Sequence, residues 1–239
     1  MEEKQLDFVL VPLGLFVLAL YHSWLLYSVL RRPNTTVIGL NALARRRWVQ
    51  AMMADSLKNG VLAVQTVRNN IMASTVLATT AITLASLISV FVSATAKSST
   101  SSALVYGNQT SLASSVKLFA ISLCFILAFL CHIQAIRYYA HVSFLVTTPP
   151  AVIDSTGDLV SVKYVARSLN RGSFFWSLGL RAFYVSFTLF LWIFGPLPMF
   201  LSCIVMCSLL YFLDTTTEHT RDLHKSFWPM DKEEGEDVV

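Results

Sequence analysis

The chain has 239 residues, of which 55% are hydrophobic and only 13% are charged, and its formal net charge is +4. A soluble domain of this length needs more charged surface, so the composition excludes a soluble globular protein and predicts a membrane protein. The long apolar runs do not alternate apolar with polar residues, which argues against a membrane β-barrel. The expected fold class is therefore an all-α integral membrane protein.

Four runs are long and apolar enough to cross a bilayer, which takes about 20 residues of helix. The first is followed by Arg31 and Arg32 rather than by a small-residue cleavage site, so we expect a retained helix and not a signal peptide. The sequence thus divides into a short polar N-terminus (1–7), a four-helix membrane domain (8–213) and an acidic C-terminal tail (214–239). The four runs are Phe8–Leu30, Ile71–Ala96, Leu118–Ile136 and Ala182–Leu213.

A further, amphipathic helix is predicted between the first two spans. Apolar residues recur with helical spacing from Leu40 to Met52, while Arg45, Arg46 and Arg47 form a basic cluster. This pattern is typical of a helix that lies on the cytoplasmic leaflet, where we expect it to bind anionic lipid headgroups. Its place beside a membrane span favours lipid over nucleic acid, and no nucleic-acid partner is expected.

Two features are predicted around the fourth span. Leu159–Asn170 reads as a short helix whose basic residues, Lys163 and Arg167, lie on its solvated or headgroup side, together with Arg171 just beyond it. The span itself is interrupted by Gly195, Pro196 and Pro198. Because proline removes a backbone hydrogen bond and glycine loosens the turn beside it, we expect a kink at this point.

The distribution of charge predicts an orientation. The two loops Arg31–Asn70 and Arg137–Arg181 hold 12 of the 18 Lys and Arg residues but only 3 of the 14 Asp and Glu residues. Since positive loops stay cytoplasmic, four spans place both termini on the non-cytoplasmic side. A glycosylation sequon at Asn108 falls on the same outer face. The membrane expected is the plasma membrane or an endomembrane.

Hydroxyl side chains form a stripe along the second span, at spacings of mostly three and four residues. Two interpretations are open. Small polar residues let helices pack closely in lipid and bond to each other. Alternatively, uncharged hydroxyls line a pore through which a hydrated ion passes. The candidate pore-lining residues are Thr75, Thr79, Thr83, Ser86 and Ser93.

Polar residues also gather at the predicted mouths. Six lie near the cytoplasmic ends of three spans and form either an inner-mouth collar or a set of anchors that reach the headgroups. Past the fourth span, Asp214 and Glu218 lie one helical turn apart and are candidates for an acidic ring at the outer mouth. The collar candidates are Gln65, Arg68, Asn69, Gln134, Arg137 and Arg181.

Enzyme chemistry is not predicted. The sequence has no metal-ligand cluster, no phosphate-binding glycine loop and no nucleophile elbow. We therefore expect no enzymatic activity, no cofactor and no metal site.

Three long segments carry a resemblance to a known family. "RRRWVQAMM", "LAVQTVRNNIMASTVLATTAI" and "SLGLRAFYVSFTLFLWIFGPLPMF" resemble a family of multi-pass membrane proteins from plants and bacteria, catalogued as domain of unknown function 599. The resemblance covers about residues 8 to 213. It implies a four-span membrane fold and assigns no activity.

The function expected from these residues is a homo-oligomeric channel for small ions, since four helices are too few to enclose a pathway but several copies can line one. The acidic outer face favours cations, whereas the basic collar suits anions. The alternatives are a membrane scaffold or lipid-organising protein with a basic cytoplasmic face, and a small secondary transporter. The absence of an inverted repeat counts against the transporter.

Overall fold

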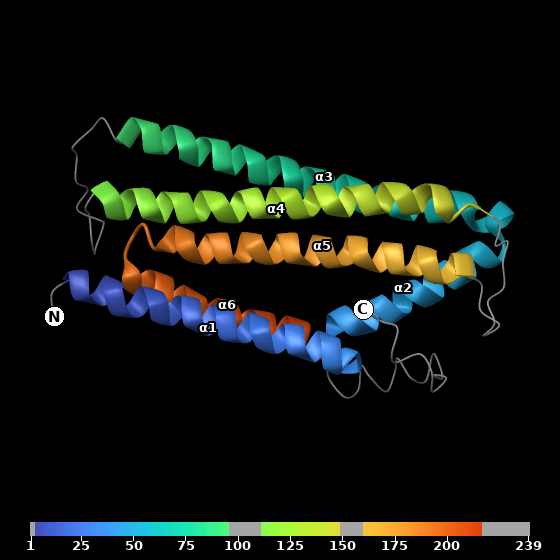
Figure 1. Ribbon diagram of the computed structural model, residues 1–239, viewed down its shortest axis with the longest axis horizontal. Helices are drawn as coiled ribbons and strands as arrows, with labels where there is room; N and C mark the ends of the chain where they lie inside the picture. The colour runs from blue at the N-terminus through green and yellow to red at the C-terminus, as the bar shows by residue number, and fades with distance from the viewer. Residues whose placement is uncertain (1–2, 96–110, 149–159, 217–239) are drawn as a thin grey trace. The chain divides into compact units, whose positions relative to one another are not determined.

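The structure is a computed structural model that describes residues 3–95, 111–148 and 160–216. In these ranges every regular element is a helix (Figure 1). The elements are α1 (Glu3–Arg31), the short 3₁₀-helix η1 (Pro33–Thr35), α2 (Val37–Ala54), α3 (Ser56–Thr95), α4 (Ser111–Leu145), α5 (Val160–Leu191) and α6 (Pro196–Asp214).

Among the described residues, five helices are long and apolar enough to cross a membrane, and α2 is not one of them. The chain is a multi-pass membrane protein, as its composition predicts. The count of four spans is not confirmed. The candidate spans are Leu6–Arg31, Ser56–Val90, Leu112–Leu145, Ser161–Leu191 and Pro196–Asp214.

The difference arises at Gly195. Residues 182–213 were expected to form one kinked span, but α5 ends at Leu191 and α6 begins at Pro196. Between them Trp192, Ile193 and Phe194 donate backbone hydrogen bonds to the carbonyls three residues earlier, at 3.0–3.1 Å. Gly195 then takes a φ of 151°, which L-residues rarely adopt. Proline at the first position of α6 needs no backbone donor. The chain therefore reverses, and α6 runs back beside α1 (Figure 1).

The helix α5 also begins earlier than the predicted span. The expected short helix over 159–170 and the first third of the expected fourth span belong to one continuous helix of 32 residues. Gly172 and Gly179 lie inside it without ending it, and no proline interrupts it.

The chain forms two compact units, and α1, α3, α4, α5 and α6 each contribute residues to both. The first unit comprises Met1–Ser23, Val76–His132 and Ser177–Leu210. Its apolar core joins α1, α3, α4, α5 and α6, with Ala81, Ile121, Ala128, Met199 and Cys203 fully buried. Alanine and cysteine at these contacts allow close approach of the helices, which is how helices associate in lipid.

Polar contacts of Trp192 hold the turn between α5 and α6 in place within the first unit. The indole Nε1 of Trp192 donates a hydrogen bond to Oδ1 of Asp7, at 3.0 Å. The buried Lys117 ammonium lies 5.5 Å from the centre of the same indole ring. The start of α1, the start of α4 and the turn after α5 are thereby held together.

The second unit comprises Trp24–Thr75, Ile133–Trp176 and Tyr211–Val239. Its core packs α2, α3, α4 and α5 together, and Val49, Ala63, Val67, Val142 and Val146 are fully buried in it. The predicted helix around Arg45–Arg47 is thus confirmed as a helix, with one face packed on this chain.

Within the second unit, the end of α6 meets the start of α2. Thr36 and Thr215 form an isolated antiparallel bridge, and the Thr216 amide donates to the Thr35 carbonyl at 3.3 Å. The sequence analysis placed these two segments on opposite faces of the membrane. Segments joined by hydrogen bonds cannot lie on opposite faces, so that arrangement is wrong for one of them.

The closest approach of α4 and α5 in the first unit generates a prediction about stability. A Cβ added at Gly179 would lie 2.7 Å from Nε2 of His132, whose ring is fully buried and cannot swing aside into solvent. We expect Gly179→Ala to destabilise the protein by about 1–3 kcal/mol, the usual cost of overpacking.

The matched control is Gly60→Ala, also inside a helix, where the added Cβ meets only the Thr147 methyl group at 3.5 Å. We expect this control to be neutral or stabilising, because alanine favours helix over glycine. Thermal unfolding of both variants in detergent, followed by tryptophan fluorescence, checks this. An equal melting temperature for the two variants would contradict the proposed crowding at His132.

Candidate functional site

A pocket of about 360 Å³ lies in the second unit, among α1, α2 and α5. The start of α2 is fixed by local contacts. The Thr36 hydroxyl accepts a hydrogen bond from the Gly39 amide at 3.2 Å, which is a standard N-cap. Gly39 packs directly on the Pro33 carbonyl, where a Cβ would collide. These contacts set the direction in which α2 leaves α1.

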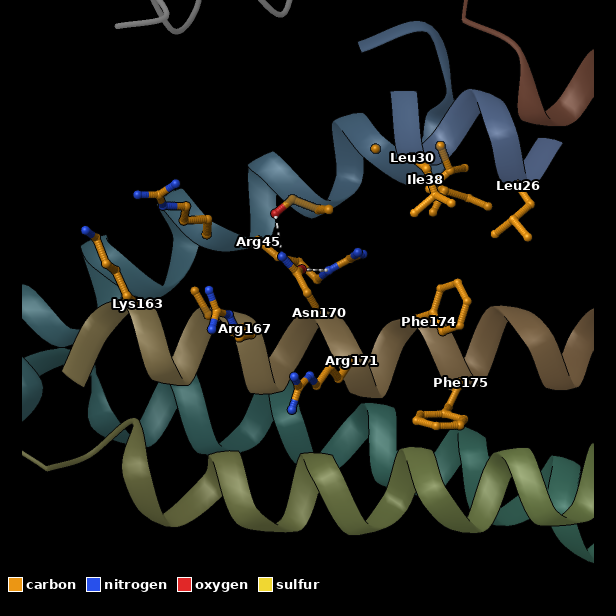
Figure 2. Close-up of a pocket in the computed structure, with 15 residues that line it drawn as sticks. Leu26, Leu30, Ile38, Arg45, Lys163, Arg167, Asn170, Arg171, Phe174 and Phe175 are labelled. Carbon is orange, nitrogen blue, oxygen red and sulfur yellow. Dashed lines mark hydrogen bonds between the residues drawn. The ribbon is translucent and has the colours of Figure 1, made fainter. Parts of the chain in front are cut away.

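One end of the pocket is basic. Arg45 and Arg46 come from α2, while Lys163, Arg167 and Arg171 recur every four residues on α5 and so share one face of that helix. Figure 2 shows Lys163 and Arg167 at the same end of the pocket, with Arg45 beside them on the facing helix. Five cationic side chains from two helices therefore surround one cavity.

Asn170 joins the two helices at this point. Its Oδ1 accepts a hydrogen bond from Nε of Arg45 at 2.8 Å, and its Nδ2 donates to the Ala42 carbonyl at 3.3 Å (Figure 2). Burial lowers the pKa of the Arg45 guanidinium from its usual value. Arginine nevertheless stays protonated in proteins, so Arg45 keeps its charge. Asn170 orients that charge without neutralising it.

The other end of the pocket is apolar. It is lined by Leu26 and Leu30 from the last turns of α1, by Ile38 from α2, and by Phe174 and Phe175 from α5 (Figure 2). The ring of Phe175 stacks on that of Tyr138, with centroids 5.8 Å apart and planes inclined by 14°.

Contacts between α4 and α5 fix the helix that carries most of the lining. The Tyr139 hydroxyl and the Ser173 hydroxyl are hydrogen-bonded at 3.1 Å, and both residues are buried. Gly172 allows the close approach, since a Cβ there would lie 3.0 Å from the Tyr139 ring. The basic and aromatic residues of α5 thus project from a helix that is held rigidly from behind.

None of the described residues that line the pocket is acidic. Over the same described ranges, neither Arg167 nor Arg171 has a hydrogen bond or an ion pair, and both are exposed. A pocket that is basic at one end and apolar at the other is complementary to an anionic amphiphile.

The comparisons with known proteins give a family and no activity. A family model described as "Protein of unknown function, DUF599" matches residues 9–219. The chain belongs to the DUF599 family. Neither curated proteins nor solved structures give a match to it.

The predicted hydroxyl stripe lies on the exposed face of α3 in this DUF599 protein. Thr75, Thr79, Thr83 and Ser86 are exposed, and the residues that α3 buries at these levels are Ser74, Ala78, Ala81 and Ala85. Hydroxyls of the stripe bond to carbonyls of α3 itself, at 2.9 Å for Thr75 and at 2.8 Å for Thr83 and Ser86. The side chain of Ser93 lies outside the described residues.

The predicted collar residues are divided between the two units. Gln65, Arg68, Asn69, Gln134 and Arg137 belong to the second unit, whereas Arg181 belongs to the first, ten residues before the end of α5. Among the residues that the structure describes, the five in the second unit form no hydrogen bond or ion pair. Arg181 was expected at the start of a span, but it lies inside α5.

The predicted acidic ring has a different position from the one expected. Asp214 is only 8% exposed and precedes the bridge between Thr215 and Thr36, so it lies in the packed second unit rather than at an open mouth. Glu218 and the sequon at Asn108 lie outside the described residues.

The sequence predicted only some of the residues that line the pocket. Both basic clusters, Arg45–Arg47 and the series through Lys163, Arg167 and Arg171, were recognised as headgroup-facing. Sequence reasoning missed Asn170 and the aromatic pair beyond it, Phe174 and Phe175. The signal was the continuation of the four-residue spacing past 170, which the expected end of the helix concealed. In the described ranges no group of three or more His, Cys, Asp or Glu residues gathers as metal ligands do.

Proposed function

We propose that this DUF599 protein is a lipid-organising membrane protein that holds an anionic phospholipid in the pocket between α1, α2 and α5. The observation that carries the proposal is the pairing of five basic side chains with an apolar end in one cavity. Its volume of about 360 Å³ falls within the range of about 300–1,000 Å³ that is usual for ligand sites.

The chemistry of each half suits one part of such a lipid. Guanidinium groups bind phosphate through paired, charge-assisted hydrogen bonds, and lysine adds a point charge. Each Lys or Arg near an anionic leaflet contributes about 1 kcal/mol, and each buried methylene contributes about 0.8 kcal/mol. The headgroup would lie between Arg45 and Arg167, and an acyl chain would follow Leu30 and Phe174.

The composition of the helices around the pocket supports a place where a leaflet changes from polar to apolar. Leu26 and Leu30 form the last turns of α1 before Arg31, and Arg171 precedes the largely uncharged remainder of α5. From Arg171 to the end of α5 is about 30 Å at the usual rise of a helix, which matches the hydrocarbon core. The basic residues would therefore be level with the headgroups.

An arrangement of five spans fits the distribution of basic residues better than four. It places the acidic tail on the same face as the pocket, because Thr216 is bonded to Thr35. Residues 31–68, 137–171 and 214–239 then share one face and hold 14 of the 18 Lys and Arg residues. Since the orientation rule counts basic residues and gives little weight to acidic ones, we propose that this face is cytoplasmic and the N-terminus is not.

Lipid binding gives the first test. We expect Arg167→Gln combined with Arg171→Gln to weaken binding of dioctanoyl phosphatidic acid about 30-fold, because two contributions of about 1 kcal/mol are lost. The affinity is measured by native mass spectrometry or by displacement of a fluorescent analogue in detergent. Both residues are exposed, so the fold should be unchanged.

The control is Arg68→Gln, an exposed arginine of α3 that does not line the pocket. It should bind the lipid as the original chain does. Inorganic phosphate should bind far more weakly than the lipid, and equal affinities would indicate an ion site instead. If the double variant and the control lose the same lipid affinity, the effect comes from general surface charge, and the pocket is not the lipid site.

Cysteine accessibility tests the orientation. In a background without the four native cysteines, Asn108→Cys should react with an impermeant maleimide from the outer side. Asn41→Cys on α2 and Ser226→Cys in the tail should react only after permeabilisation. Labelling of Ser226→Cys together with Asn108→Cys would support four spans and overturn the arrangement with five.

A homo-oligomeric channel is the second candidate, and the exposed hydroxyl face of α3 is the observation that favours it. If several copies meet through this face, Thr79→Val and Thr83→Val should alter single-channel conductance in planar bilayers. Thr80→Val, an exposed threonine one position off the stripe, should leave it unchanged. Purified protein that is monomeric and passes no current would remove this candidate.

A further inference from the structure

The described chain ends beside the pocket. After α6 it passes Thr215, which bridges to Thr36, and reaches Thr216, whose amide bonds to the Thr35 carbonyl at 3.3 Å. The ring of Tyr211 in the last turns of α6 packs on Trp24, with centroids 5.5 Å apart. Ile38, only a few residues beyond this anchor, lines the pocket. The tail is therefore tethered at the rim of the cavity.

The sequence beyond this anchor contains an acidic segment of opposite charge to the pocket. Residues 231–237, "DKEEGED", hold five acidic side chains and one basic side chain. The pocket presents the reverse pattern, five basic side chains and, among its described lining, no acidic one.

The length of the connecting chain suits the distance. The acidic segment begins 15 residues after Thr216, and 15 residues can span at most about 50 Å. From Thr36 to Arg45 is nine residues of α2, or about 14 Å of helix. The segment can therefore reach the pocket, and a short tether that spans the required distance gives an effective concentration in the millimolar range.

We infer that the acidic segment Asp231–Asp237 occupies the basic end of the pocket and competes there with the anionic headgroup. The identity of the competing lipid rests on the proposed function, whereas the contact between tail and pocket does not. Exposed ion pairs are worth only about 0.2–1 kcal/mol each and are screened by salt, so the tail is a weak competitor that a favoured lipid displaces.

The first experiment compares lipid affinity with and without the tail charges. A variant that stops after Thr216 should bind dioctanoyl phosphatidic acid about 3–10-fold more tightly than the full chain, a factor set by a millimolar tether and weak pairs. Replacing the five carboxylates by amides should give the same gain at full length. A peptide of residues 228–239 should reverse the gain, and the gain should shrink as salt rises.

The second experiment detects the contact without lipid. Gly235→p-benzoylphenylalanine in the full-length protein should cross-link on illumination to α2 or α5, and Arg167→Gln with Arg171→Gln should abolish the product. Cross-links between two chains of different mass would assign the segment to a second copy and overturn an intramolecular competitor.

The two proposals can fail separately. If truncation leaves the lipid affinity unchanged while Arg167→Gln with Arg171→Gln weakens it, the contact between tail and pocket is refuted and the lipid site is supported. If Arg167→Gln with Arg171→Gln abolishes the cross-link but leaves lipid binding unchanged, the tail contact is supported and the lipid site is refuted.

Discussion

Backbone groups within a bilayer have no water to bind, so a chain can leave a helix there only where neighbouring groups satisfy its hydrogen bonds. The turn between α5 and α6 keeps its own backbone amides hydrogen-bonded within four residues. Three backbone amides bond to carbonyls three positions earlier, and Gly195 turns the chain through a φ of 151°. Asp7 and Lys117 hold Trp192 at the same turn. Because the chain reverses rather than bends, α6 brings Thr215 to Thr36 and sets where the tail starts.

The pocket has a polarity gradient because of where its helices change composition. The last turns of α1 are apolar up to Leu30 and then end in two arginines, while α5 changes from basic to aromatic between Arg171 and Phe174. α2 packs across both transitions, and Asn170 holds Arg45 against α5 at 2.8 Å. An asparagine suits this position, since it accepts from the guanidinium and leaves its full charge for a ligand. An acidic residue there would neutralise the charge.

Hydropathy predicted the class of fold and the positions of most helices, because a helix that crosses lipid must be apolar along its own length. It failed between residues 182 and 213, where two helices follow each other with only four residues between them. An uninterrupted apolar run with a Gly-Pro pair is read equally well as one kinked helix or as two helices. The choice depends on contacts of Trp192 with Asp7, 185 residues away, which no local pattern reveals.

The same limit applies to the site. Helical spacing places Lys163, Arg167 and Arg171 on one face, and Arg45 on another helix, without indicating that the two faces meet. That meeting depends on Asn170, a residue whose local sequence resembles the end of a helix. The predicted orientation meets a related difficulty, since it places Asp214 and Thr36 on opposite faces although Thr215 bridges to Thr36.

Polar residues within the spans separate into two groups, and the distinction bears on how pores are recognised. Exposed threonines such as Thr83 return a hydrogen bond to their own helix, so they can face lipid at little cost. The buried His132 has no hydrogen-bond partner for either ring nitrogen among the described residues, which is costly in an apolar core. It packs against Phe183 and occupies the space that Gly179 leaves. A hydroxyl stripe therefore does not by itself indicate water. In the basic pocket, Arg167 and Arg171 are exposed and bind no acid in the described chain, so their charges require an anion or solvent.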